Sequence, residues 1–205
     1  MKAIGSDARD SLRGLPDRVR LPIAFDPGPL EEELAGIAQS EWTAHPVADN
    51  HDGGWSAAAL RAPDGETHPI RMISAASGAR RYVDTPLLAR CPRLAQVVAQ
   101  FRCELELVRL MRLEAGSVIR EHRDPDLDAA RGMARLHVPI ATGPGVDFRV
   151  AGRRVDMEPG SVWYLRLSEP HSVVNRGDLP RVHLVLDALI DDWLTGLLLA
   201  GDCGD

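Results

Sequence analysis

The sequence predicts a mostly β fold with flanking helices, in which the strands form a double-stranded β-helix, that is, a jelly-roll or cupin-like barrel. From residue 105 onward, eight short strand-like runs follow one another without a helical pattern between them. Most of the separators are short and rich in Gly and Pro, as turns require. Only the charged gap 123–133 is long. The predicted strands are Leu105–Leu113, Ser117–His122, Ala134–Ala141, Val146–Ala151, Arg153–Met157, Ser161–Leu167, His171–Asn175 and Arg181–Ala188.

The first 104 residues show a different pattern, with polar loops and short helical segments. A helix is predicted over 30–37, because Pro residues precede it and apolar residues recur at i, i+4 and i+7. A second helical segment begins at Thr85 and is interrupted by Pro92. Residues 43–82 resemble a loop. We therefore expect 1–104 to be a helical and loop extension that packs on the barrel. Residues 105–205 form the core, with a closing helix over 189–200, and the two parts make one structural unit.

Composition excludes several functional classes. The net charge is −6 and the pI is about 5.6, which argues against nucleic-acid binding. No apolar stretch approaches the roughly 18 residues of a membrane span, and the first residues show no secretory signal. The three cysteines are odd in number and do not follow a zinc-motif spacing. These observations favour a cytoplasmic protein with reduced thiols, and they do not predict an oligomeric state.

Two histidines and one aspartate form a candidate metal site. His122 ends the second predicted strand and His171 opens the seventh. In an eight-stranded jelly roll these two strands pair, so the two histidines should meet. Asp124 lies two residues after His122 and would share its side of an extended chain. Two imidazoles and one carboxylate on one face are typical of non-haem Fe(II) oxygenases, whose open positions admit a co-substrate and O₂.

Basic residues occupy alternate positions within the third and eighth predicted strands. Arg135 shares a face with His137, and Arg181 shares a face with His183. These polar faces could simply meet solvent. If the aliphatic faces pack outward against helices instead, the arginines point into the barrel beside the metal. A guanidinium there could hold a carboxylate through two parallel hydrogen bonds, which would suit a dicarboxylate ligand.

Several segments carry a resemblance to a known family. The residues in 108–124, 135–140, 157–164, 170–175 and 181–187, together with 82–88, resemble the aspartyl/asparaginyl β-hydroxylase family. The resemblance covers roughly residues 82–188. It implies an Fe(II)- and 2-oxoglutarate-dependent dioxygenase on a double-stranded β-helix.

The resemblance also implies roles for individual residues. His122, Asp124 and His171 would bind Fe(II), and Arg181 would bind the distal carboxylate of 2-oxoglutarate. Arg135 and His137 would lie near the metal-chelating end of that co-substrate.

Mammalian members lack the carboxylate ligand, whereas Asp124 is present here, as in bacterial members and the related proline cis-hydroxylases. The membrane span and helical-repeat domain of the large animal members are absent, so their substrates are not transferred.

The expected reaction is hydroxylation of an unactivated C–H bond, with O₂ and 2-oxoglutarate consumed. The family name favours the β-carbon of an Asp- or Asn-like side chain, and hydroxylation of a proline-type amino acid is the alternative. The substrate could be a free amino acid, a carrier-bound aminoacyl group or a peptide.

Two other functions remain open. A cupin-type metal enzyme without 2-oxoglutarate is suggested by the His-x3-Asn spacing of His171 and Asn175, although His-x-Asp replaces the expected His-x-His. A non-catalytic binding module is the other.

Outside the metal site, we expect His183 to be a hydrogen-bonded barrel residue. His45, His51 and His68 should be solvated loop residues, and loop 123–133 is the candidate cover over the site.

Overall fold

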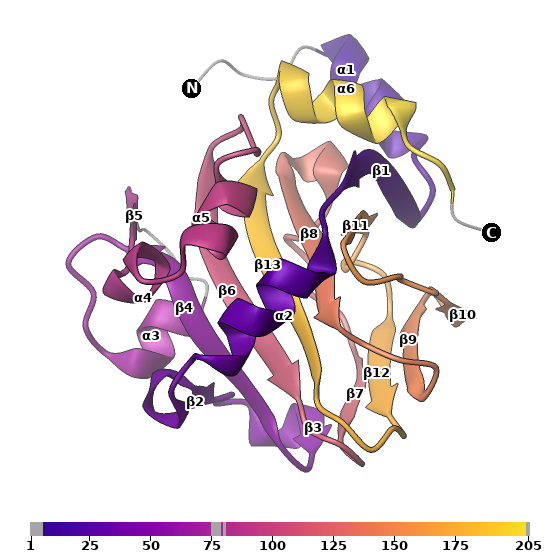
Figure 1. The fold of residues 1–205 in the computed structure, drawn as a ribbon. Helices are drawn as coiled ribbons and strands as arrows, with labels where there is room; N and C mark the ends of the chain where they lie inside the picture. The colour runs from indigo at the N-terminus through magenta and orange to yellow at the C-terminus, as the bar shows by residue number, and fades with distance from the viewer. Residues whose placement is uncertain (1–5, 75–78, 80, 204–205) are drawn as a thin grey trace.

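Two β-sheets face each other and helices cover the outer face of the larger one (Figure 1). The structure is a computed structural model that describes residues 6–74, 79 and 81–203. Over these residues the larger sheet has the order β1-β11-β8-β13-β6-β4-β2, with β5 paired to β4, and the smaller has the order β10-β9-β12-β7-β3. The larger sheet contains β1 (Arg18–Ala24), β2 (Thr43–Ala44), β4 (Trp55–Pro63), β5 (Tyr82–Asp84), β6 (Leu105–Leu113), β8 (Met133–Ala141), β11 (Ser161–Leu165) and β13 (Arg181–Leu189). The smaller contains β3 (His51–Asp52), β7 (Val118–His122), β9 (Val146–Val150), β10 (Arg153–Arg154) and β12 (His171–Asn175).

The helices begin where the sequence supplies capping groups. The Asp26 side chain accepts a hydrogen bond from the Gly28 N–H at the start of α2, and Asp191 does the same for Leu194 at the start of α6. Pro92 separates α4 from α5, as predicted. The helices are α1 (Ser6–Arg13), α2 (Pro27–Ala35), α3 (Pro69–Ile73), α4 (Pro86–Ala89), α5 (Pro92–Val98) and α6 (Asp192–Ala200), with 3₁₀ turns at Gln39–Glu41, Ala48–Asn50 and Ala129–Arg131.

Side-chain alternation on β13 divides the interior into two apolar layers. Leu184 and Leu186 point outward and pack with residues of the helices, including Leu30 and Leu194. Val185 points the other way, into the space between the two sheets. The aliphatic face therefore packs against helices, and the face that carries Arg181 and His183 points into the barrel. The sequence left open whether this polar face meets solvent or the barrel interior, and it faces the interior.

All eight predicted strands exist as β6 to β13, although the fifth is reduced to Arg153–Arg154. The predicted pairing of the second and seventh runs is confirmed, since His122 and His171 are Cα partners in the β7–β12 ladder. The helical and loop character expected for 1–104 is wrong in part, because β1 to β5 lie there. The nine-residue strand β4 pairs with β6 along most of its length, so residues 43–82 include a strand of the main sheet.

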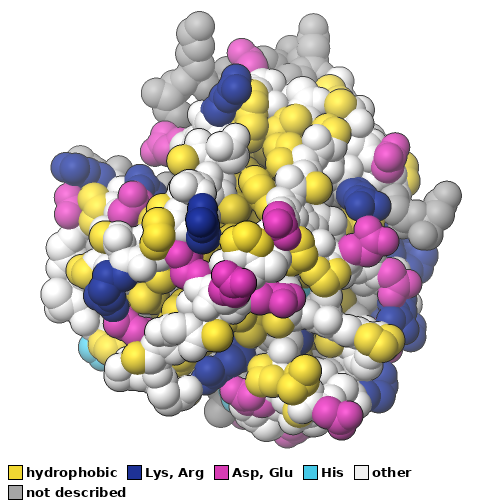
Figure 2. Space-filling model, in the orientation of Figure 1, with side chains coloured by type: hydrophobic (Ala, Val, Ile, Leu, Met, Phe, Trp, Pro, Cys, Tyr) yellow, Lys and Arg dark blue, Asp and Glu magenta, His cyan; other side chains and the backbone are white. Residues whose placement is uncertain are grey.

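The face of the molecule that carries α2 shows acidic and basic side chains interspersed with small apolar areas (Figure 2). Among the described residues, no helix is long and apolar enough to cross a lipid bilayer.

Candidate metal centre and its cavity

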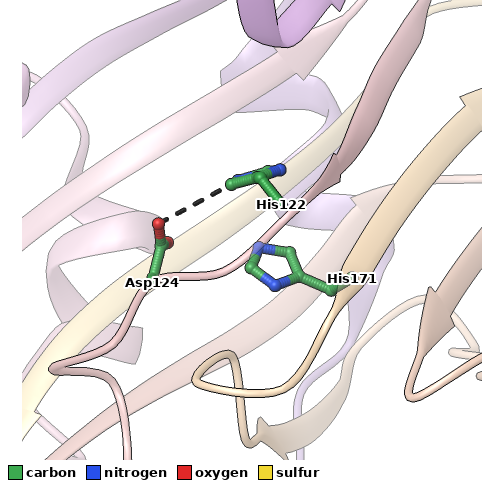
Figure 3. A group of neighbouring side chains, drawn as sticks. All are labelled: His122, Asp124 and His171. Atoms are coloured by element: carbon green, nitrogen blue, oxygen red, sulfur yellow. Dashed lines mark ion pairs between the residues drawn. The ribbon is translucent and has the colours of Figure 1, made fainter.

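The three predicted metal ligands converge at one end of the β7–β12 pair (Figure 3). His122 is the last residue of β7, Asp124 follows it, and His171 is the first residue of β12. One potential ligand atom from each residue lies within 4.8 Å of the others. The His122 Nε2 atom and the Asp124 Oδ1 atom are 4.0 Å apart. Such spacing suits three ligands on one face of a metal ion.

Backbone carbonyls orient both imidazoles. The Nδ1 atom of His122 lies 2.8 Å from the Arg120 carbonyl oxygen, and Nδ1 of His171 lies 3.1 Å from that of Glu169. A carbonyl only accepts, so each Nδ1 carries a proton, and Nε2 is the ring nitrogen that each histidine can offer to a metal. Burial lowers the pKa of His171 to about 4, which keeps this ring neutral near pH 7. The Asp124 backbone N–H donates to the Leu167 carbonyl, which fixes the third ligand.

Asp187 organises a buried charge network behind Asp124. Its carboxylate accepts hydrogen bonds from Arg135 Nε at 2.6 Å, Arg135 Nη2 at 2.9 Å and Arg109 Nη2 at 2.8 Å. Arg135 then donates through Nη1 to the second oxygen of Asp124, 3.1 Å away. Burial alone would raise the pKa of Asp187, but Arg135 and Arg109 bring it below its ordinary value. Asp187 is therefore an anion that holds Arg135 against the candidate ligand.

Arg181 has a different environment. It is 3% exposed, and burial lowers its pKa to about 9. Within the described residues no carboxylate pairs with it. Its Nη2 atom instead lies 2.6 Å from Nδ1 of His183, and its guanidinium carbon lies 5.4 Å from the centre of the Phe148 ring. Nδ1 of His137, on the neighbouring strand β8, is 3.4 Å from Nδ1 of His183. His183 is thus a hydrogen-bonded barrel residue, as predicted.

These groups border one cavity of about 150 Å³. Its polar wall combines the three candidate ligands with buried arginines and His137, and its apolar wall comes from both sheets and from the segment that precedes β4. The lining residues are His45, Val47, Asn50, Trp55, Arg109, Met111, Ile119, His122, Asp124, Arg135, His137, Phe148, Leu167, His171, Val173 and Arg181. All six site residues predicted from the sequence therefore line the same cavity.

The segment 45–55 forms an aromatic wall that the sequence did not reveal. The His45 ring stacks on Trp55 with ring centres 3.5 Å apart, and the His51 ring meets Trp55 edge-on at 5.6 Å. Burial, then the charge of Arg109, lowers the pKa of His45 to about 4. The expectation of a solvated loop residue is therefore wrong for His45. It holds for His68, which is exposed.

Loop 123–133 contributes only Asp124 to the lining. Leu127 of this loop packs instead into the apolar layer between the sheets. We expected loop 123–133 to cover the site, whereas the segment 45–55 supplies several of the residues that line the cavity.

Sequence reasoning also missed Arg109 and Asp187. A signal for Asp187 was present, because it follows Arg181 and His183 at even spacing along β13 and so shares their inward face.

Comparison with known proteins identifies relatives. The family described as Aspartyl/Asparaginyl beta-hydroxylase matches residues 30–190, a longer span than the resemblance first suggested. The L-proline cis-4-hydroxylase of Rhizobium meliloti (strain 1021) is 28% identical over 167 residues, which are 80% of this chain. The chain spans only 58% of that relative's length.

Two solved structures share the fold. A 2OG-Fe(II) oxygenase family oxidoreductase from Burkholderia pseudomallei is 19% identical with a TM-score of 0.53, over 92% of each chain. The epimerase SnoN, solved in complex with Fe³⁺, alpha ketoglutarate and nogalamycin RO, is 15% identical with a TM-score of 0.54. This match covers 90% of the present chain and 84% of the epimerase. Both support the predicted jelly-roll fold.

Proposed function

Because the chain belongs to the aspartyl/asparaginyl β-hydroxylase family, we propose that it is an Fe(II)- and 2-oxoglutarate-dependent dioxygenase that hydroxylates an amino acid or amino-acid residue. One observation carries the proposal. A two-histidine, one-aspartate cluster borders the same cavity as a buried arginine that pairs with no carboxylate of the described residues. The first arrangement suits a metal with open positions, and the second suits a ligand that brings its own carboxylate.

The donor set fits Fe(II). Two imidazoles that can each offer Nε2, together with one carboxylate, would form a facial triad that leaves coordination positions for other ligands. His122, Asp124 and His171 would hold the metal. Asp124 offers one oxygen to it while Arg135 engages the other.

The arginine fits the distal carboxylate of 2-oxoglutarate. Arg181 is a buried cation whose Nε atom has no hydrogen-bond partner among the described residues. A buried donor without a partner destabilises the protein by about 1–3 kcal/mol, so a carboxylate that satisfies it should bind well. We propose Arg181 as the residue that binds it, with Arg135 and His137 near the metal-chelating end.

When bound, Fe(II) with 2-oxoglutarate and O₂ would supply the oxidising power for hydroxylation, with conversion of 2-oxoglutarate to succinate and CO₂. The chain itself would orient and shield the reactants. Asp187 fixes Arg135, and Arg135 in turn fixes Asp124. Trp55, Met111 and Phe148 give the cavity apolar walls that limit access of water.

Two substrate types deserve direct comparison. The family description favours the β-carbon of an Asp- or Asn-like side chain. The similarity to an L-proline cis-4-hydroxylase, together with the carboxylate ligand Asp124, favours a proline-type amino acid. The aromatic wall of His45 and Trp55 offers a flat apolar surface that a saturated ring can contact.

The test is a panel of free amino acids, short peptides and carrier-bound aminoacyl groups, assayed for substrate-stimulated succinate formation with Fe(II). We expect one class to stimulate succinate release and to gain one hydroxyl group by mass spectrometry. The His122→Ala protein is the control and should give neither product. Full activity of the wild-type protein after removal of its metal would contradict the proposal.

A further inference from the structure

The side chain that contacts the Arg181 guanidinium is an unusual partner for a buried arginine. Buried charges are normally paired with an opposite charge. Over the described residues, the polar contact of Arg181 is instead with Nδ1 of His183, at 2.6 Å. The Phe148 ring lies on another side of the guanidinium. Orientation of this arginine therefore depends strongly on one imidazole.

The chemistry of the contact fixes the state of His183. A guanidinium has five N–H donors and no acceptor, so Nδ1 of His183 must accept. The ring is then neutral and carries its proton on Nε2. The environment agrees, because burial and then the charge of Arg181 hold the pKa of His183 well below its ordinary value. Nδ1 of His137 on β8 lies 3.4 Å from the same atom and can only donate to it, so the 2.6 Å contact from Arg181 is the shorter of the two.

A neutral acceptor does what a carboxylate in the same place would not. An aspartate would orient the arginine but would also cancel its charge and compete with an incoming carboxylate. A histidine orients the guanidinium and leaves the full positive charge available. Strand alternation provides the geometry, since residues two apart on β13 share a face.

We propose that His183 is a positioning residue, which holds Arg181 in place for the distal carboxylate of the co-substrate without neutralising it. This inference rests on the proposed function. His183 itself need not touch 2-oxoglutarate, because its effect passes through Arg181.

Three substitutions separate the two effects proposed for His183, which are orientation of Arg181 and preservation of its positive charge. His183→Asn keeps a neutral acceptor near the position of Nδ1, His183→Leu removes the acceptor, and His183→Asp keeps an acceptor but adds a negative charge. Leu184→Ala is the control, because Leu184 is equally buried on the opposite face of β13 and contacts the outer apolar layer. The Kd of 2-oxoglutarate for the Co(II)-loaded protein would be measured for each by calorimetry, alongside the Kd of Co(II).

We expect the Leu variant to raise the Kd of 2-oxoglutarate about tenfold or more, because Arg181 loses a hydrogen bond to a charged group. The Asp variant should raise it by a similar factor of about tenfold or more, because the added carboxylate cancels the charge of Arg181 and competes with the co-substrate. The Asn variant should stay within about threefold of the wild-type protein. Leu184→Ala should lower the melting temperature and leave this Kd unchanged. Co(II) affinity should be similar in all variants.

An Asp variant that binds 2-oxoglutarate as well as the Asn variant would overturn the role of the neutral acceptor. An Asn variant as weak as the Leu variant would overturn the positioning role. If the wild-type protein binds Co(II) but no 2-oxoglutarate, the proposed function itself fails, which is a distinguishable result.

Discussion

Two clusters of polar side chains lie at the cavity, and they differ in their contact with water. One is formed by the candidate metal ligands, and the other by Arg181, which lines the cavity, with its hydrogen-bond partner His183. The candidate ligands His122 and Asp124 have side chains that are 17% and 34% exposed. Arg181 and His183 are only 3% and 1% exposed. Apart from Asp124, which follows β7, these residues lie on strands predicted from the sequence, and both clusters contain histidine. Their environments nevertheless suit different tasks.

The difference follows from what each cluster must bind. A metal centre that exchanges ligands needs open positions, so partial exposure of its carboxylate and one imidazole is useful. A site that recognises one carboxylate gains from burial, because the attraction between charges grows as water is excluded. The charge network around Asp187 shares a feature with each cluster. Its Arg109–Asp187 pair is buried, as Arg181 and His183 are, and its Arg135 donates a hydrogen bond to the candidate metal ligand Asp124.

The largest effect should come from the exposed cluster. His122→Ala removes one of three candidate ligands, so we expect turnover to be abolished while the fold is retained, because this side chain belongs to neither of the two buried apolar layers. Succinate formation and circular dichroism check the two parts. Turnover near the wild-type rate would show that the metal, if bound, lies elsewhere.

Asp187→Asn should mainly affect stability. It leaves Arg109 and Arg135 buried without their shared anion, and we expect the free energy of unfolding to fall by about 3–5 kcal/mol. Urea denaturation measures the change. Asp156→Asn is the matched control, because Asp156 pairs with Arg154 at the surface and should matter by less than about 1 kcal/mol. Equal effects at the two positions would rule out a structural role for the network.

Arg181→Ala should affect the co-substrate and spare the metal. Removal of one partner of a buried charge pair typically costs about 2–5 kcal/mol, so the Kd of 2-oxoglutarate should rise about 30-fold or more. Calorimetry with the Co(II)-loaded protein measures it, and Arg176→Ala, at an exposed arginine, is the control. An unchanged Kd would refute the role given to Arg181.

The smallest effect concerns pH. His45 and His171 have pKa values of about 4 in the folded protein, chiefly because they are buried, against about 6.5 in the unfolded chain. The unfolded state therefore binds more protons between pH 6.5 and 4, and the free energy of unfolding should fall as the pH drops through this window. Above pH 6.5 the same residues should cause no further change.

Urea midpoints at pH 7 and pH 5 test this expectation. His45→Phe removes one of these two imidazoles and keeps an aromatic ring against Trp55, so its midpoint should depend less on pH than that of the wild-type protein. A pH dependence that is equally steep in both proteins would contradict the assignment.

The sequence predicted the second half of the fold well because its turns carry clear Gly and Pro signals. It failed at β4, whose Ala57, Ala58 and Ala59 have low strand propensity, so that pairing with β6 rather than local preference makes the strand. Strand β1 was also missed, although Val19, Leu21 and Ile23 alternate with other residues. Pro22 in that segment obscured the pattern, yet proline is tolerated because β1 lies at the sheet edge.

The candidate site shows the same division. Its three ligands could be predicted because a short motif and one strand pairing bring them together. The wall formed by His45 and Trp55 could not, because it depends on the path of a segment built from one short 3₁₀ turn and a two-residue strand, which leave little pattern in the sequence. Buried Arg109 lies on β6 with a second arginine, Arg112, three positions later, and only the partner Asp187 reveals the role of Arg109.

The most direct test is an anaerobic titration of metal-free protein with Fe(II), followed by 2-oxoglutarate. We expect one Fe(II) per chain, with 2-oxoglutarate binding that requires the metal. We also expect His171→Ala to lose the Fe(II) site and Arg181→Ala to retain it. Fe(II) binding that survives in His171→Ala with wild-type affinity would contradict the central claim.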